Sequence, residues 1–238
     1  MRNIVAIARK ELSIYFATPT AYVVAGVFLA LAGVFFTDSV DRPFAEATMQ
    51  GVLVNSVFFL VPLLTPILTM RLLAEEQKLG TIELLLTSPV RDYEVIVAKY
   101  LASFIILSAM VLLTLFYVLI LSYYSAPDPG PIISGYLGFL LYGGAGLAIG
   151  LAASSLTGNQ IVSAVVGFGI TFLFTVIDRV GGILTGTAAN VLQQLSMTTH
   201  YDAFARGVID MGDVVYYLLL IAVFLFLASR SLESRRWR

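Results

Sequence analysis

The sequence contains no cysteine, one histidine, three lysines and few charged residues overall. The lack of cysteine excludes disulfides, thiol catalysis and zinc–thiolate sites, and His200 alone cannot form a metal cluster of several histidines. A net charge of −1 provides no basic field that would indicate nucleic acid as a partner. We therefore expect neither a metal site nor a nucleic-acid partner.

Catalytic motifs are missing as well. A P-loop requires a glycine directly before a lysine, so that backbone amides and the ammonium group can hold phosphates. Here the three lysines follow Arg9, Gln77 and Ala98. Neither G-x-S-x-G nor H-E-x-x-H occurs, which leaves hydrolase chemistry without its usual residues. The sequence predicts a chain that is not an enzyme and has no cofactor of its own.

Apolar residues, by contrast, are abundant. They make up 59% of the chain and charged residues 12%, whereas soluble domains average roughly 25% charged residues. About 20 apolar residues cross a bilayer core, and six stretches approach that length: residues 20–37, 52–73, 100–123, 132–155, 160–177 and 214–229. The expected fold is an all-α integral membrane protein, with one transmembrane domain over residues 1–238.

The basic residues are distributed unevenly between the two sides of these spans. Eleven lie on the side of the termini and of the loop between spans two and three, against three (Arg42, Arg179 and Arg206) on the other. The positive-inside rule then places both termini in the cytoplasm, in the cytoplasmic (inner) membrane. We expect essentially no ionisable residue inside the spans, which argues against an autonomous channel or ion-coupled carrier.

The N-terminal segment 2–17 has the pattern of an amphipathic helix. Ile4, Ile7 and Leu12 recur at helical spacing, and Thr18-Pro19 follows as a helix break. We expect an interfacial elbow helix leading into the first span, in preference to a frayed tail. A cleaved signal peptide is disfavoured, because ten residues separate Lys10 from the first span.

Two spans carry unusual residues. Span two contains Asn55 and the pair Pro62 and Pro66, which predict an irregular helix. The prolines fit a passive packing bend and a pivot beside a translocation path equally well. In span four, Gly146, Gly150 and Ser154 repeat every fourth residue, a face of small side chains suited to close helix packing.

The segment 73–99, on the predicted cytoplasmic side, is the candidate docking surface. We expect Gly80 to end one helix, Thr81 to cap a short one, and Ser88-Pro89 to begin the next. Apolar side chains on this side need a cover, which is either a protein partner or the membrane surface, and the sequence does not decide between them. The candidate coupling residues are Gly80, Thr81, Ile82, Glu83, Leu84, Leu85, Ser88 and Pro89.

The segment 178–213, on the other side, is too long and too apolar for a simple connection. Short helices that re-enter the outer leaflet would account for its pattern. We expect His200, Asp202 and Arg206 near the water boundary. Together with residues of span two they form the set of pathway or gate candidates: Asn55, Pro62, Pro66, His200, Asp202 and Arg206.

Four segments carry a resemblance to a known family. They are residues 9–22 with Arg9-Lys10-Glu11-Leu12, residues 75–89 with Gly80-Thr81-x-Glu83-Leu84-Leu85 and Ser88-Pro89, Lys99, and residues 204–217. On these segments the chain resembles permease subunits of the ABC-2 exporter class, and within it the gliding-motility-associated permeases. The match runs along the whole chain.

The resemblance implies partners and a mechanism. It implies a cytoplasmic ABC ATPase dimer that binds ATP and magnesium, a second permease protomer (identical or different), and an accessory membrane-anchored protein. Residues 81–87 would be the coupling helix. An alternative role remains, in which the ATPase drives a membrane anchor or mechanical platform without transport.

Overall fold

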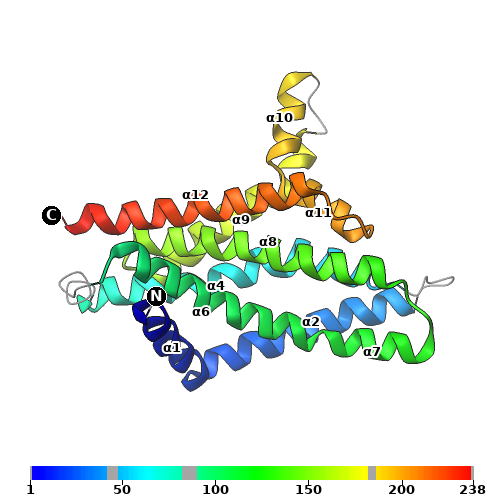
Figure 1. Ribbon diagram of the computed structural model, residues 1–238, viewed down its shortest axis with the longest axis horizontal. Helices are drawn as coiled ribbons and strands as arrows, with labels where there is room; N and C mark the ends of the chain where they lie inside the picture. Colours follow the sequence, from blue (N-terminus) through cyan, green and yellow to red (C-terminus); the bar gives the residue numbers. More distant parts are fainter. Residues whose placement is uncertain (1, 42–47, 82–89, 182–185, 237–238) are drawn as a thin grey trace.

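The computed structural model describes residues 2–41, 48–81, 90–181 and 186–236, and this part of the chain is all helical, without strands. The long helices lie side by side in one bundle (Figure 1). In chain order the helices are α1 (Arg2–Ala17), α2 (Pro19–Val40), α3 (Gln50–Asn55), the π-helical turn η1 (Ser56–Leu60), α4 (Val61–Lys78), α6 (Asp92–Leu113), α7 (Leu115–Tyr124), α8 (Pro129–Leu156), α9 (Gln160–Gly181), α10 (Thr187–Leu195), α11 (Met197–Ala205) and α12 (Met211–Arg236).

The six expected spans are confirmed. Among the described residues, six helical segments are long and apolar enough to cross a membrane: Pro19–Val40, Gln50–Lys78, Asp92–Tyr124, Pro129–Leu156, Gln160–Arg179 and Met211–Ser234. The protein is therefore a multi-pass membrane protein. Both termini lie toward the end of the bundle where α4 ends and α6 begins, here called the terminal end (Figure 1). The opposite end, where α2 ends and α8 begins, is called the distal end.

Spans two and three are longer than expected, because their helices continue beyond the apolar residues. Span two reaches Lys78, and Gly80 then ends it with a φ of +70°, a conformation that glycine adopts without a steric penalty. The next described helix, α6, begins at Asp92, with Arg91 as its N-cap. A capping interaction fixes this start, since the Arg91 backbone N–H donates to Glu94 Oε2 at 3.1 Å.

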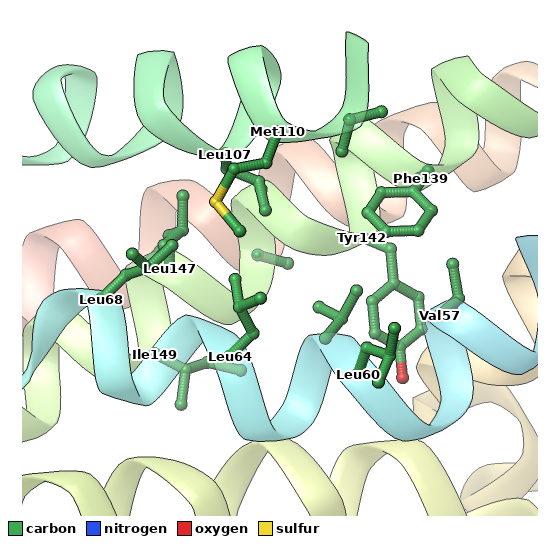
Figure 2. Close-up of a cluster of buried hydrophobic side chains, with 14 of the residues drawn as sticks. Val57, Leu60, Leu64, Leu68, Leu107, Met110, Phe139, Tyr142, Leu147 and Ile149 are labelled. Carbon is green, nitrogen blue, oxygen red and sulfur yellow. The ribbon is translucent and has the colours of Figure 1, made fainter. Parts of the chain in front are cut away.

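Helices α4 and α8 form the centre of the bundle. Within one apolar 18-residue stretch of each span, buried residues make up 61% in span two and 67% in span four, but only 11% in the spans formed by α2 and α12. A hydrophobic cluster fills the space between α4, α6 and α8, and Figure 2 shows Leu64, Leu107 and Phe139 among its members. The outer helices therefore leave most of their apolar surface facing away from the protein.

The face of small residues on α8 packs closely against α4, as its spacing predicted. A Cβ atom added at Gly146 would lie 2.7 Å from Thr65 Oγ1, and one at Gly150 would lie 2.1 Å from Thr69 Oγ1. Such distances leave no room for a side chain, so glycine is required for this approach. The two threonine hydroxyls instead donate to carbonyl groups one turn earlier in α4.

The elements at the two ends correspond to the other expected helices. At the terminal end α1 is a separate helix, and Thr18 adopts an extended conformation between α1 and α2. Toward the distal end, α10 and α11 occupy the segment between α9 and α12, and α10 projects from the side of the bundle (Figure 1). That α1 lies in the membrane interface, and that α10 and α11 re-enter the outer leaflet, remain predictions.

Candidate coupling site at the terminal end

The described part of the candidate docking surface consists of the end of α4 and of residues 90–99, which include the start of α6. Gly80 terminates the helix as expected, and the Thr81 hydroxyl donates to the Glu76 carbonyl at 3.4 Å. The other candidates in this segment lie outside the described residues: Ile82, Glu83, Leu84, Leu85, Ser88 and Pro89. What the structure does establish is how α4 is held immediately before them.

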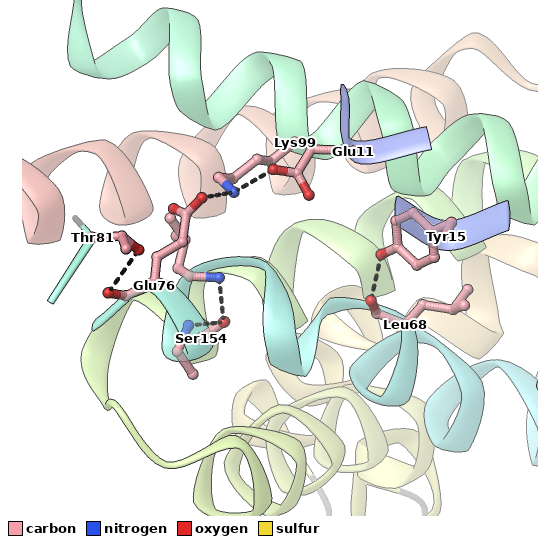
Figure 3. A network of polar contacts seen from close by, with 9 residues as sticks. Glu11, Tyr15, Leu68, Glu76, Thr81, Lys99 and Ser154 are labelled. Carbon is pink, nitrogen blue, oxygen red and sulfur yellow. Dashed lines mark hydrogen bonds and ion pairs between the residues drawn. The ribbon is translucent and has the colours of Figure 1, made fainter. Parts of the chain in front are cut away.

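A buried ionic cluster holds α4 to two other helices. Lys99 Nζ of α6 lies 2.7 Å from Glu11 Oε1 of α1 and 2.9 Å from Glu76 Oε1 of α4 (Figure 3). The side chains of Lys99, Glu11 and Glu76 are 1%, 8% and 18% exposed. These residues are called the Lys99 cluster. Because a buried charge without its partner is costly, the cluster joins α1, α4 and α6 strongly.

The Lys99 cluster corrects the expectation that the spans contain essentially no ionisable residue. Lys99 and Glu76 belong to the helical segments Asp92–Tyr124 and Gln50–Lys78. Both were expected in the connecting segment, because the apolar runs stop short of the helix ends. They lie close to the terminal end of their spans, so the expectation still holds for the middle of the bundle.

A second attachment joins α4 to α8. Ser154 Oγ accepts hydrogen bonds from the backbone N–H groups of Leu73 at 3.1 Å and Ala74 at 3.0 Å, and it donates to the Met70 carbonyl at 3.0 Å. The Gln77 amide donates to the carbonyls of Ser154 and Ser155. The last turns of α4 are thus hydrogen-bonded directly to the end of α8.

Tyr15 forms the third attachment. Its hydroxyl donates to the Leu68 carbonyl of α4 at 2.5 Å, and the Arg71 guanidinium carbon lies 4.6 Å from the centre of its ring. Burial raises the pKa of Tyr15 above its ordinary value, so the hydroxyl remains a neutral donor. Glu11 and Tyr15 are one helical turn apart on α1. Tyr15 bonds directly to α4, whereas Glu11 is linked to α4 through Lys99 of α6.

The gate candidates of span two surround the π-helical turn. Asn55 is the last residue of α3, η1 follows it, and Pro62 stands in the first turn of α4. Pro66 lies inside α4 and is buried. Because a proline cannot donate a backbone hydrogen bond, the helical pattern is expected to become irregular nearby.

Of the gate candidates in the other segment, His200 and Asp202 lie on α11 and Arg206 directly follows it. His200 Nδ1 is 2.7 Å from Asp213 Oδ1, its Nε2 is 3.0 Å from the Gln194 carbonyl, and its ring stacks on Tyr216 at 3.9 Å between centroids. His200 therefore connects the end of α10, α11 and the start of α12. Both of its ring nitrogens face acceptor oxygens.

Asp202 and Arg206 are exposed, in contrast to His200. Desolvation by the surrounding protein raises the pKa of Asp202, and the charge of Arg206 partly offsets this effect. Within the described residues, no hydrogen bond or ion pair joins these α11 side chains to Asn55, so the two groups of gate candidates do not form one cluster.

Several residues of these sites were not predicted from the sequence. Glu11, Glu76 and Ser154 were not recognised as site residues, and Lys99 was noted only for a family resemblance. A lysine directly before an apolar run was the one available signal, because its carboxylate partners are 88 and 23 residues away in the chain.

Comparison with known families covers nearly the whole chain. A family model described as "ABC-2 family transporter protein" matches residues 6–237, a range that includes the Lys99 cluster and all six spans. A search of curated proteins gives no match.

Proposed function

Because the chain belongs to the ABC-2 family of transporter proteins, we propose that it is the permease subunit of an exporter driven by a separate ATPase. The chain has no P-loop, so ATP and its magnesium ion would bind only to the partner. The excess of basic residues at the terminal end supports a cytoplasmic location for that end, in the cytoplasmic membrane. The finer resemblance to gliding-motility-associated permeases stays a prediction.

The observation that carries this proposal is the Lys99 cluster. Its Glu76 lies just before the candidate coupling residues 81–87. The cluster joins α4 to α1 and α6 through contacts of 2.7 and 2.9 Å between Lys99 Nζ and the carboxylate oxygens of Glu11 and Glu76. In the proposed mechanism, an ATPase dimer contacts these residues and moves the end of α4. The cluster and the Ser154 hydrogen bonds would then pass this movement to α1, α6 and α8. Helices α1, α4 and α6 cannot separate there without exposing a buried charge, and α8 cannot leave α4 without breaking the Ser154 hydrogen bonds.

The proposal also assigns roles to the rest of the bundle. The outward apolar faces of α2 and α12 suit lipid or a second permease protomer, identical or different. Pro62 and Pro66 would let span two bend when its terminal end moves, and α11 with His200, Asp202 and Arg206 would help to close the far side. An accessory membrane-anchored protein is the least supported of the proposed partners.

Leu84→Asp tests the docking surface. The tagged permease is purified from its native membrane, the copurified ATPase is identified by its P-loop, and its amount and ATP turnover are measured. We expect Leu84→Asp to lower the amount of bound ATPase about tenfold, since burying one leucine contributes roughly 1.5–3 kcal/mol. Glu83→Ala should lower it less, as expected for a charge at the rim of an interface.

Ala126→Asp, which adds the same charge in the α7–α8 loop at the distal end, serves as the control and should keep the ATPase. Full retention of the ATPase by Leu84→Asp, with normal turnover, would place the docking surface elsewhere. A wild-type permease with no stoichiometric ATPase would contradict ATP-driven export itself. ATP turnover without movement of any solute across sealed vesicles would favour a mechanical platform.

A further inference from the structure

A cavity of about 190 Å³ lies at the terminal end, between α1, α2, α4 and α9. Its polar lining comprises Tyr15, Thr20, Arg71, Glu75 and Gln160. Helices α2 and α9 begin here, at Pro19 and Gln160, so the cavity lies where two spans reach the surface of the bilayer. Lipid headgroups occupy this level of a membrane.

Arg71 and Glu75 give the cavity one positive and one negative charge. The Arg71 guanidinium stacks on Tyr15, and its Nη1 lies 3.4 Å from Thr20 Oγ1. Within the described part of the chain, neither Arg71 nor Glu75 belongs to an ion pair. Residues four apart on a helix lie on the same side, so the two charges face one region while remaining separate from each other.

The cavity continues into apolar grooves. A groove of about 140 Å³ between α2 and α4 shares Val24 and Ile67 with it. Another, of about 250 Å³ between α4 and α9, also shares Ile67 and is lined by Pro66 and Phe168. Apolar grooves therefore extend from the polar cavity along span two.

We propose that this site binds one membrane phospholipid with a phosphoethanolamine headgroup. The phosphate lies against the Arg71 guanidinium and the Thr20 hydroxyl, and the primary ammonium group lies against the Glu75 carboxylate. One acyl chain follows the groove between α2 and α4. A zwitterion matches the paired charges, and a primary ammonium can donate hydrogen bonds to Glu75 that the quaternary ammonium of choline cannot. The Glu75 carboxylate would repel a headgroup that carries only negative charge.

This assignment does not depend on an ATPase partner, because it uses only the membrane location and the residues of one chain. It has a structural consequence, since the lipid contacts Tyr15 of α1 and Arg71 of α4 at the same time. The bound lipid would therefore reinforce the attachment of α1 to α4, next to the Lys99 cluster.

The headgroup is tested with purified, delipidated permease and three phospholipids of identical chains, carrying ethanolamine, choline or glycerol headgroups. Native mass spectrometry counts the lipids retained. We expect one ethanolamine lipid to be retained preferentially, and Arg71→Gln and Glu75→Gln each to lower its retention about tenfold. Lys10→Gln removes a charge from the exposed side of α1 and should leave retention unchanged.

The acyl chain is tested separately. Val27 lines the groove between α2 and α4 and is 52% exposed, so Val27→Trp should fill the groove and displace the lipid. Val34→Trp, at a position of α2 with 58% exposure outside the groove, is the matched control. Free phosphoethanolamine should compete only weakly, because it lacks the chains.

Three results would overturn the proposal. The first is equal retention of the ethanolamine lipid by the wild type and by Arg71→Gln. The second is a preference for the glycerol lipid that Glu75→Gln strengthens, which would show an anion site. The third is competition by free phosphoethanolamine as strong as that of the whole lipid, which would show that the groove has no part in binding.

Discussion

The two ends of the bundle are fastened by different chemistry. At the terminal end, the Lys99 cluster holds three helices through charges that are almost fully buried. At the distal end, neutral hydroxyls supply buried attachments: Tyr217 donates to the Met197 carbonyl at 2.6 Å, and Ser134 donates to the Phe204 carbonyl at 2.7 Å. His200 and Asp213 add one contact between ionisable side chains there. Neutral hydrogen bonds contribute about 1 kcal/mol each, while opening a buried ion pair costs several times more.

The difference teaches where the bundle can change shape. Hydrogen bonds between neutral groups can break one at a time, and each costs little free energy. Helices α9, α11 and α12 can therefore shift at the distal end at a modest cost in stability. The terminal end combines the Lys99 cluster with the hydrogen bonds of Ser154, Gln77 and Tyr15, and it is expected to move as one piece. This division suits a protein that receives force at one end and opens at the other.

The largest expected effect comes from Lys99→Met, which leaves the Glu11 and Glu76 carboxylates buried together without a cation. We expect a loss of about 3–5 kcal/mol in the free energy of unfolding, measured by thermal unfolding in detergent. Lys10→Met, on the exposed side of α1, is the control and should change the free energy of unfolding little.

The triple variant with Glu11→Gln and Glu76→Gln added to Lys99→Met should regain much of the loss. Equal melting temperatures of Lys99→Met and Lys10→Met would show that the cluster does not hold the terminal end.

Gly150→Ala should have an intermediate effect, because it tests the approach of α4 and α8 without changing any charge. The added methyl group would lie 2.1 Å from Thr69 Oγ1 and 3.3 Å from Pro66 Cα. Overpacking of this kind costs about 1–3 kcal/mol, measured by the same thermal unfolding.

A double variant checks the cause of that loss. Adding Thr69→Ala removes the hydroxyl, so the cost of Gly150→Ala should be smaller in that background than in the wild type. Gly26→Ala is the matched control, since a methyl group there meets nothing within 4 Å. A loss from Gly26→Ala as large as that from Gly150→Ala would contradict the packing explanation.

The smallest effect is expected from Tyr142→Phe at the distal end. Thr175 Oγ1 donates to the Thr171 carbonyl, so Tyr142 must be the donor in its 2.6 Å hydrogen bond with Thr175. Its loss should cost about 1 kcal/mol. Tyr123→Phe, at a position 84% exposed, should be neutral.

Combining Tyr142→Phe with Lys99→Met sharpens the comparison. The two side chains share no hydrogen-bond partner, so their effects on the melting temperature should add. A double variant that departs strongly from additivity would mean that the two ends are not independent.

The sequence predicted the parts of this fold that depend on local composition. Apolar runs predicted the six spans, Thr18-Pro19 predicted the break after α1, and the spacing of Gly146 and Gly150 predicted close helix packing on α8, although not that α4 is its partner. The predicted helix ends were less accurate than the predicted spans. Helices α4 and α6 continue into polar residues, which a search for apolar runs leaves out. The break between α6 and α7 at Thr114 has neither proline nor glycine to announce it.

The site was predicted less completely than the fold, for a physical reason. Gly80 ends α4 as expected, since a positive φ is a local property of glycine. The pairing of Lys99 with Glu11 depends instead on how distant helices pack, and a single sequence does not contain that information. His200 was predicted near a boundary, but its partner Asp213 followed only from the position of α12.

The hydrogen bonds of Ser154 restrict the kinds of relative motion open to α4 and α8. One hydroxyl meets two consecutive amides and a carbonyl of α4, so all three bonds converge at a single point. Sliding by one helical turn, about 5.4 Å, would break them all at once. Rocking about that point would keep them, because the distances there change least. Of the shear and hinge motions open to packed helices, this junction selects the hinge and fixes the position of its axis.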